Sequence, residues 1–318
     1  MTRPVLITGA GGCIGAWVLY LLHQQGDSAV AFDLSEDRRR LDLLYDEPAD
    51  APDIQWETGD IADSERVAEV FARHNPRAVI HLAALQVPYC VATPALGASV
   101  NVIGCVNVLE SAKTCGATVA YASSVAATAM ESYSDGWKQT LYGAYKVCNE
   151  QTARVYWEDA GVPSIGIRPA VVYGAGRDRG MSAAPTFAML AAALGRKYVA
   201  PFRGAVGFVH SGEAAAAFIR AANAATEKAR VFTLDGQTQT VEEVCEMIRA
   251  KVPGADVDCS GDALPFPSGA GDDDAPLREC IGEYRRPSFS EGLSETIDFF
   301  MRRIQQNRIG GADLEAAK

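Results

Sequence analysis

The chain has 318 residues, of which 48% are hydrophobic and 22% charged, so it is long and apolar enough to bury a substantial core. Its net charge of -11 at pH 7 argues against a broad basic surface of the kind that binds nucleic acid or an anionic membrane. We therefore expect a globular protein of one large or two interlocked domains, whose partner is a small molecule.

The eight cysteines and four histidines show neither the spacing of metal ligands nor that of a disulfide framework. We predict no metal site, and we expect the cysteines to be reduced and mostly buried. The chain enters directly into a strand-like run, and no window reaches membrane-spanning length. These features predict a cytoplasmic protein.

The first motif along the chain is a strand, a glycine turn and a helix. Residues 4–8 form a short β-branched apolar run, and residues 16–25 carry apolar side chains at helical spacing. The glycines at 9, 12 and 15 permit a tight turn, close approach of the backbone to a pyrophosphate, and close helix packing. The spacing GxxGxxG differs by one residue from the dinucleotide-binding fingerprint, and its place between strand and helix predicts that role.

A second buried strand, residues 28–32, ends at Asp33. An acidic side chain here can accept hydrogen bonds from both ribose hydroxyls of an adenosine and repels a 2'-phosphate, which favours NAD over NADP. Three arginines follow shortly after, Arg38, Arg39 and Arg40. Because an arginine could bind the 2'-phosphate of NADP, they weaken the expected preference for NAD. We interpret the three arginines as the exposed face of a helix.

Strands and helices continue to alternate along the first half of the chain. With few hairpin signals, this order predicts a parallel sheet covered by helices on both faces, which is an α/β fold. Residues 41–53 have the pattern of a loop or a broken helix. The further strands are expected at residues 54–58, 78–84, 118–122 and 230–234, and the helices at residues 63–74, 95–115 and 142–160.

Tyr142 and Lys146 are four residues apart, so on a helix they share one face. An ammonium beside a phenol favours the phenolate, which makes Tyr142 a candidate acid and base. Tyr145 points to another side of the same helix and stays outside this pairing. The strand at 118–122 delivers Ser123 and Ser124 at its carboxyl end, where open α/β sheets bind ligands.

Five elements occur together and in order along the chain: the glycine turn, Asp33, Asp60-Ile61, His81-Leu-Ala-Ala84, and Ser124 ahead of Tyr142-x-x-x-Lys146. In this combination the chain resembles the extended short-chain dehydrogenase/reductase family, also called the NAD-dependent epimerase/dehydratase family. The resemblance continues through residues 168–174 and 208–210, and it is weak beyond about residue 220.

This resemblance implies a Rossmann-type doubly wound parallel sheet with a smaller C-terminal substrate-binding lobe. Residues 1–172 would form the NAD-binding domain, with a returning strand near 229–235, and residues 173–318 would mostly form the lobe. The resemblance also implies NAD as the cofactor and a homodimer as the assembly.

Matching positions acquire roles from the same resemblance. Ser124 would hold the substrate oxygen, Tyr142 would exchange its proton, and Lys146 would bind the nicotinamide ribose beside Tyr142. The other cofactor-binding positions are Gly9, Gly12, Cys13, Ile14 and Gly15 for the pyrophosphate, Asp33 for the adenosine ribose, Asp60 and Ile61 for the adenine, and Ala83 and Asn101 near the middle of the cofactor.

Departures from the family pattern bear on the substrate. Dehydratases commonly carry Thr-Asp-Glu starting at the position of Ser124, whereas this chain continues with Val125 and Ala126, so it lacks the acid pair for eliminating water. Nucleotide-sugar epimerases commonly have Asn where this chain has Val171, and Arg where it has Val206. Because an apolar side chain cannot hydrogen-bond a diphosphate, we favour a substrate without a nucleotide.

The second half of the chain is expected to supply the substrate lobe. Helices are predicted at residues 186–194, 213–225 and 293–307, and another starts at Thr240 with a capping box that Glu243 completes. Residues 253–276 have the composition of a disordered or substrate-covering loop, and residues 310–318 that of a frayed tail. The polar candidates for substrate binding are Gln86, Ser124, Arg177, Ser182 and Arg203.

We predict an NAD-dependent oxidoreductase that acts on a secondary hydroxyl of a sugar, a sugar acid or a related hydroxy-carbonyl compound. Tyr142 would take the hydroxyl proton while hydride passes to NAD, and Ser124 would polarise the same oxygen. Release of NADH would make the enzyme a dehydrogenase; return of the hydride would make it an epimerase, with a nucleotide-sugar 4-epimerase as the alternative. A non-catalytic NAD-binding regulatory protein predicts loss of the Ser, Tyr or Lys, and this chain keeps all three.

Overall fold

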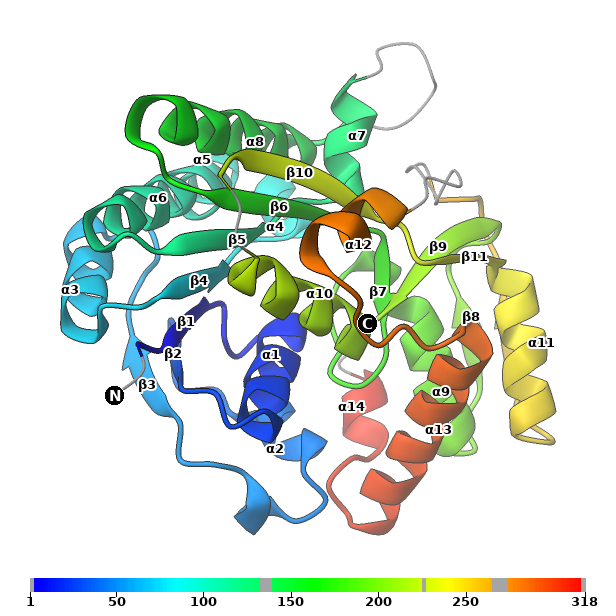
Figure 1. Cartoon of the computed structure of the whole chain (residues 1–318). Helices are drawn as coiled ribbons and strands as arrows, with labels where there is room; N and C mark the ends of the chain where they lie inside the picture. Colours follow the sequence, from blue (N-terminus) through cyan, green and yellow to red (C-terminus); the bar gives the residue numbers. More distant parts are fainter. Residues whose placement is uncertain (1–2, 132–138, 225–226, 265–273, 316–318) are drawn as a thin grey trace.

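A seven-stranded parallel sheet forms the centre of the molecule (Figure 1). The computed structural model describes residues 3–131, 139–224, 227–264 and 274–315. The strand order is β10-β6-β5-β4-β1-β2-β3, and it reverses between β1 and β4, where doubly wound sheets bind ligands at the carboxyl ends. The strands are β1 Val5–Thr8, β2 Ala29–Asp33, β3 Gln55–Thr58, β4 Ala78–His81, β5 Thr118–Ala122, β6 Ser164–Pro169 and β10 Ala229–Leu234.

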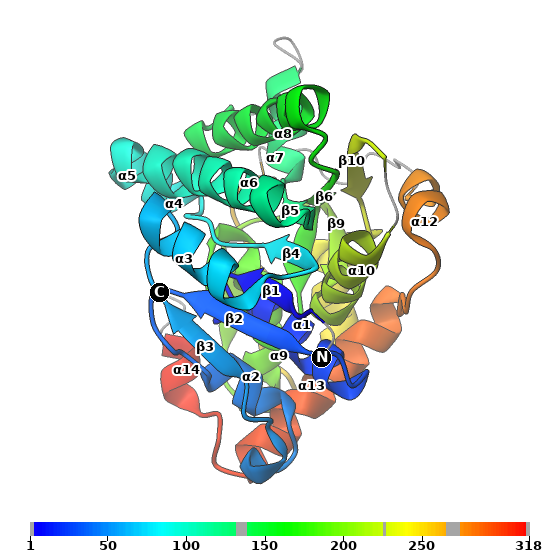
Figure 2. The ribbon, with the colours of Figure 1, turned by 60° about the vertical axis from the view of Figure 1, so that its left-hand side comes forward.

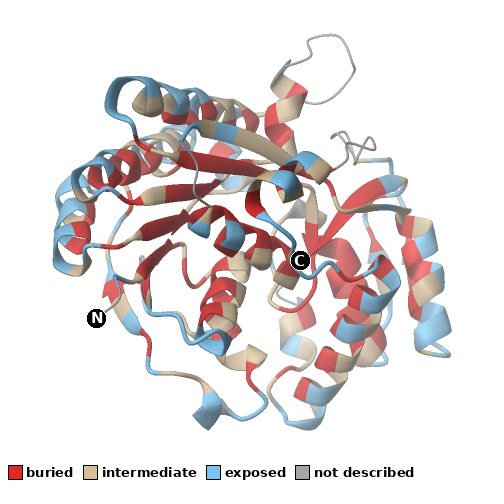
Figure 3. Ribbon diagram, in the orientation of Figure 1, coloured by how far each residue is buried: buried red, intermediate tan, exposed pale blue. Residues whose placement is uncertain are grey.

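Helices cover both faces of this sheet (Figure 2). Side chains alternate between the faces, so Val5 and Ile7 pack under one helix layer while Leu6 packs under the other. Figure 3 shows the strands as a buried band between helices whose outer sides are exposed. One layer holds α1 Cys13–Gln24, α10 Ser211–Asn223 and α12 Ala275–Ile281; the other holds α3 Ser64–His74, α6 Gly104–Cys115 and α8 Leu141–Ala160.

The predicted α/β fold and the returning strand are therefore confirmed. β10 pairs in parallel with β6, so residues 229–234 form an edge strand of the main sheet. The chain thus returns to this sheet after it has left it at the end of β6. All pairs of neighbouring strands described in this sheet are parallel, as the alternating order predicts.

A second apolar cluster lies beyond the main sheet, around Phe187, Phe208 and Phe300. It is built on a three-stranded sheet, β11-β9-β7, and a two-stranded sheet, β12-β8. The predicted capping box is present, because Thr240 and Glu243 bond reciprocally at the start of α11. The elements are β7 Val171–Tyr173, η3 Met181–Ala183, α9 Ala184–Ala193, β8 Tyr198–Ala200, β9 Ala205–His210, β11 Gln237–Thr240, α11 Val241–Lys251, β12 Val257–Cys259, α13 Phe289–Gln305 and α14 Gly311–Glu315.

Several short helices are absent from the sequence prediction. Pro88 and Pro94 each lie in the first turn of a helix, where a missing N–H costs nothing, although a proline more often suggests a break. The missed elements are α4 Val87–Ala92, α7 Val125–Glu131 and α12. Two other short helices, α2 Arg39–Leu44 and η1 Pro48–Asp50, lie where a helix of arginines and a broken helix are predicted, and α5 Pro94–Ala98 begins the helix predicted at 95–115.

Two expectations about the second half of the chain were wrong in part. Residues 311–315 form α14 rather than a frayed tail, because Leu314 is buried against the second cluster. Within residues 253–276, β12 pairs with β8. Residues 265–273 of that predicted loop lie outside the described part of the chain.

The predicted helix at 95–115 contains a wider turn. It runs as α5, then a π-helical turn η2 Ser99–Ile103, then α6. The whole stretch Pro94–Cys115 is long and apolar enough to cross a membrane, so the expectation that no window reaches that length was wrong. Half of its most apolar window is buried inside the fold, where it covers the sheet as a core helix does.

Candidate active site

The glycine turn between β1 and α1 is packed so tightly that side chains cannot enter it. Gly9 has a φ of +71°, and a Cβ there would lie 2.6 Å from the backbone nitrogen of Ala83. A Cβ on Gly15 would lie 2.3 Å from the carbonyl oxygen of Gly9. The turn therefore brings β1, α1 and the segment after β4 into backbone contact at the point where the strand order reverses.

Helix α1 begins at Cys13 without a side-chain cap, since Gly12 occupies the N-cap position. Its first N–H groups, including those of Cys13 and Ile14, point out of the turn together with the positive end of the helix. Burial raises the pKa of the Cys13 thiol to about 12, so no thiolate competes for this position. An uncapped, side-chain-free cradle of this kind fits the pyrophosphate of a dinucleotide.

Asp33 ends β2 beside this cradle. Its carboxylate accepts hydrogen bonds from the backbone N–H groups of Gly11, at 2.9 Å, and Leu34, at 2.8 Å. These bonds hold the carboxylate at the carboxyl edge of the sheet, and each oxygen keeps a lone pair for a further donor. The position and orientation fit the ribose role that the resemblance implies.

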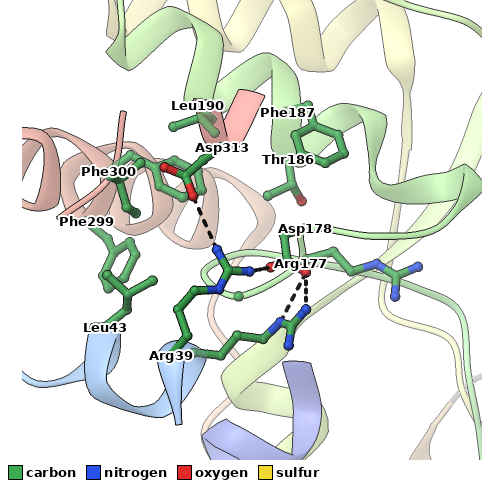
Figure 4. A pocket seen from close by; sticks show the side chains of 13 residues that line it. Arg39, Leu43, Arg177, Asp178, Thr186, Phe187, Leu190, Phe299, Phe300 and Asp313 are labelled. Carbon is green, nitrogen blue, oxygen red and sulfur yellow. Dashed lines mark hydrogen bonds and ion pairs between the residues drawn. The ribbon is translucent and has the colours of Figure 1, made fainter. Parts of the chain in front are cut away.

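The interpretation of the three arginines as an exposed helix face was wrong for Arg40, which is 6% exposed, whereas the Arg39 side chain is 48% exposed. Arg40 donates to the Gly11 carbonyl at 2.7 Å and binds Asp178 through Nε and Nη2. Arg39 bridges Asp178 and Asp313 (Figure 4). Arg38 donates to the carbonyl of Pro52. Because all three guanidinium groups have protein partners, this geometry favours NAD over NADP.

The two residues predicted to contact the adenine, Asp60 and Ile61, follow β3. Asp60 accepts from the N–H of Ala62 at 2.9 Å, and Ile61 is buried against Gly104, where a Cβ would lie 2.8 Å from an Ile61 methyl carbon. The amide of Asn107 donates to the Ile61 carbonyl at 3.0 Å. These contacts fix the loop after β3 on α6, beside the end of β2.

Lys146 is anchored at the carboxyl end of β5. Its ammonium donates to the carbonyl of Ala122 at 2.6 Å and lies 5.4 Å from the centroid of the Tyr142 ring. Ser124 follows Ala122 by two residues, and its hydroxyl accepts from the N–H of Ala126 at the start of α7. Tyr145 is turned away, because its hydroxyl donates to the Pro94 carbonyl at 3.0 Å.

The π-helical turn brings Asn101 towards the same helix. The Asn101 amide nitrogen donates to the carbonyl oxygens of Gly97 and Leu85, and the Asn101 carbonyl accepts from the Asn149 side chain at 2.9 Å. Because a π turn displaces backbone hydrogen bonds by one residue, it leaves the Asn101 carbonyl available to Asn149 on α8. Asn101 thus positions α8, one turn beyond Lys146.

A buried ion pair behind this site was missed by the sequence reasoning. Glu150 on α8 receives two bonds from Arg168 on β6, at 2.8 and 2.6 Å, and a third from the hydroxyl of Ser123. Arg168 also donates to Thr128 of α7. The pair therefore joins α8, β5, β6 and α7. Its signal in the sequence is the position of Glu150, four residues after Lys146 on the same helix face.

Three of the predicted substrate residues come together. Arg177 donates through Nη2 to the Ser182 hydroxyl at 3.2 Å. A Cβ on Gly180 would lie 2.5 Å from Gln86 Oε1 and 3.1 Å from Arg177 Nη2, so both side chains flank this glycine. Arg203 shares no described contact with them; it is half exposed and pairs with Glu242 at the start of α11.

Within the described residues, no group of three or more His, Cys, Asp or Glu side chains could hold a metal ion. Burial, with a smaller effect of Lys146, lowers the pKa of His81 to about 3, so this imidazole is neutral. His81 shares a 2.7 Å hydrogen bond with Thr8 across the ends of β4 and β1.

The doubly wound sheet, the glycine cradle and the paired Tyr142 and Lys146 define a dinucleotide-binding α/β protein. The family model described as NAD dependent epimerase/dehydratase family matches residues 5–234, from the first residue of β1 to the last of β10. The chain therefore belongs to the NAD-dependent epimerase/dehydratase family, an enzyme family of the extended short-chain dehydrogenase/reductase type, and its cofactor is NAD.

Known proteins resemble the chain over most of its length. The UDP-glucose 4-epimerase of Mycolicibacterium smegmatis is 26% identical, and the match covers 94% of this chain and 99% of that protein. The solved UDP-glucose 4-epimerase of Thermus thermophilus in complex with NAD superposes with a TM-score of 0.76 at 22% identity, covering 93% of this chain and 98% of that one. A monomeric L-threonine 3-dehydrogenase from a metagenome reaches a TM-score of 0.79 at 23% identity, covering 94% and 99%.

Matches to other curated relatives are shorter. The chain spans 36%, 54% and 30% of the length of three that are 32–34% identical to it. At identities below 25%, the two solved structures support the fold, and the particular reaction has to be argued from the site.

Proposed function

We propose that the protein is an NAD-dependent oxidoreductase that acts on a secondary hydroxyl of a carbohydrate-like small molecule. The observation that carries this proposal is the placement of Tyr142 and Lys146 on one face of α8, with the Lys146 ammonium held on the Ala122 carbonyl at the carboxyl end of β5. That edge of the sheet also carries the glycine cradle and Ser124.

Bound NAD supplies the hydride acceptor. Tyr142 takes the proton from the substrate hydroxyl, and the Lys146 ammonium lies beside its ring, 5.4 Å from the centroid. Ser124 donates a hydrogen bond to the same substrate oxygen and polarises it. The cradle of Gly9, Gly12 and Gly15 orients the cofactor for the transfer.

A dehydrogenase is favoured over a nucleotide-sugar 4-epimerase. Val206, where such epimerases commonly carry an arginine, is 1% exposed and packs in the second apolar cluster. Val171 is a further apolar side chain, in β7, where a polar one is common. Neither side chain can bond a diphosphate. The epimerase stays the second candidate because a relative that matches nearly the whole chain carries that activity in its name.

The two reactions differ in the fate of the hydride. The purified protein with NAD is incubated with sugars, sugar acids, hydroxy amino acids and nucleotide sugars, while the NADH absorbance band and product NMR are followed together. We expect NADH to accumulate in step with a keto product of a nucleotide-free substrate. An isomerised nucleotide sugar without NADH would establish the epimerase. NAD binding without any turnover would favour a non-catalytic regulatory protein.

Asp33 is proposed to set the preference for NAD. In the variant Asp33→Asn, the side-chain oxygen still accepts the Gly11 N–H while the negative charge is lost, so repulsion of a 2'-phosphate disappears. We expect kcat/KM with NADP to rise about tenfold relative to that with NAD, which corresponds to about 1.4 kcal/mol. Steady-state rates with both cofactors measure the ratio.

The control for this variant is Asp53→Asn, the same charge change on an exposed side chain ahead of β3, at the opposite edge of the sheet. Its cofactor ratio should match that of the unaltered protein. An Asp33→Asn enzyme that discriminates against NADP as strongly as its parent would remove Asp33 from the ribose site.

A homodimer in the cytoplasm is proposed by family resemblance. The outer sides of η2 and α8 carry exposed apolar side chains that a second copy could cover, including Ile103 and Val155, which are 48% and 51% exposed. The mass of the protein in solution, measured by light scattering, decides the assembly, and a mass of one chain would contradict it.

A further inference from the structure

Arg177 differs from the other inward-facing arginines in having no acidic partner within the described residues. Arg40, Arg168 and Arg303 each bind a carboxylate. Among the described residues, the Arg177 side chain makes one hydrogen bond, to the hydroxyl of Ser182, and its Nε is buried without a partner there. An unpaired N–H of a charged group out of contact with water costs free energy that an added acceptor removes.

Asp178, the acidic residue next to Arg177 in the chain, does not pair with it. Both carboxylate oxygens of Asp178 are taken by Arg39 and Arg40. Figure 4 shows the Arg177 side chain running away from this cluster, on the other side of the loop. The charge of Arg177 is therefore left for a ligand, whereas Arg39 and Arg40 are paired with Asp178 within the protein.

The surroundings of Arg177 are those of a polar subsite. Nη2 and the Gln86 amide oxygen both lie next to Gly180, which has a φ of +98° and leaves no room for a Cβ. Gln86 is the N-cap residue of α4. It follows the segment after β4, whose Ala83 packs on the glycine turn. Arg177 therefore lies between the glycine turn and the start of α4, at the carboxyl edge where doubly wound sheets bind ligands.

We propose that Arg177, with Ser182 and Gln86, forms a subsite for a carboxylate of the substrate. This proposal rests on the proposed oxidoreductase function and narrows its substrate to hydroxy acids. The planar guanidinium binds both oxygens of a carboxylate, and Gln86 and Ser182 are suited to hydroxyls next to it. A carboxylate is favoured over the pyrophosphate of NAD, because the uncapped N-terminus of α1 already supplies donors to that group.

The test compares acids with alcohols of the same skeleton. D-gluconate is paired with D-sorbitol and D-glucuronate with D-glucose, since each pair differs by a carboxylate in place of a hydroxymethyl group. Calorimetry measures the affinity of each for the complex of the protein with NAD. We expect the acid of at least one pair to bind about tenfold or more tightly than its alcohol.

Three variants assign the effect to one side chain. Arg177→Met should abolish the preference for acid, whereas Arg177→Lys should retain part of it because the charge remains without the fork. Arg179→Met removes the same charge from an exposed neighbour and should change nothing. The affinity for NAD should stay within about threefold in all variants.

The same measurements distinguish the carboxylate from the other anions that Arg177 could bind. Loss of NAD affinity in Arg177→Met with unchanged acid binding would assign Arg177 to the cofactor pyrophosphate and overturn the proposal. Arg177-dependent binding of UDP-glucose in place of the acids would overturn it in favour of a diphosphate. If neither acid binds better than its alcohol, the proposal is overturned as well.

Calorimetry measures binding of the acid and does not require turnover. The carboxylate subsite and the proposed oxidoreductase function are therefore tested independently. Arg177-dependent binding of an acid without NADH formation from any compound would contradict the oxidoreductase and leave the carboxylate subsite supported. NADH formation from neutral sugars alone, with no preference for acids, would support the oxidoreductase and reject the subsite.

Discussion

Replacing Tyr142 by Phe is expected to lower kcat by about 10²–10⁴-fold, the usual contribution of a positioned acid or base. The ring and its contact with the Lys146 ammonium are retained, so only the proton-transferring hydroxyl is lost. Affinity for NAD should stay nearly unchanged, because the glycine cradle and Asp33 are untouched. Stopped-flow or steady-state NADH formation gives the rate, and calorimetric titration gives the cofactor affinity.

Tyr145 offers a matched control three residues further along the same helix. Tyr145→Phe also removes a phenolic hydroxyl, but this one donates to the Pro94 carbonyl on α5. We expect its activity to be close to that of the unaltered protein. Full activity of Tyr142→Phe, or an equal loss in both variants, would show that the proton is moved by another group.

The second large effect is expected in the buried pair of Glu150 and Arg168. The Glu150 side chain is 4% exposed and that of Arg168 14%, so removing one partner leaves a charge buried without its counterpart. Arg168→Met should lower the free energy of unfolding by about 3–5 kcal/mol. For a chain of this size, that corresponds to a melting temperature lower by about 4–8 °C in a thermal scan.

Arg154→Met is the control, since Arg154 pairs with Glu158 on the same helix but both side chains are more than half exposed. It should cost less than about 1 kcal/mol. The double variant Glu150→Met/Arg168→Met should recover part of the loss, because no lone charge stays buried. Equal stability of Arg168→Met and Arg154→Met would mean that the pair contributes nothing beyond a surface bridge.

The parts of the fold that could be predicted are those encoded in a few consecutive residues. The run from Val5 to Thr8 and the glycines at 9, 12 and 15 specify strand, turn and helix locally, and the structure has them there. The helix of Tyr142 follows from its own spacing. The π turn at Asn101 could not be read in this way, because it depends on Asn149 bonding to a carbonyl from another helix.

Contacts between distant segments explain what the sequence reasoning missed at the site. Arg40 looks like a solvated arginine until Asp178, 138 residues later, is brought against it. Glu150 resembles an ordinary helix acid until β6 supplies Arg168. By contrast, the sequence predicts three polar candidates for substrate binding, Gln86, Arg177 and Ser182, that the structure brings around Gly180.

The cluster of Arg39, Arg40, Asp178 and Asp313 has a consequence for building chimeric enzymes. It ties the loop of the cofactor turn, through the Gly11 carbonyl, to the segment after β7 and to the last described helix. If the lobe of a relative replaced everything after β7, Arg39 and Arg40 would stay near the cofactor, but Asp178 and Asp313, which bind them here, would be lost. A workable exchange would have to carry residues 39 and 40 along with the lobe, so the natural unit of recombination here is discontinuous in sequence.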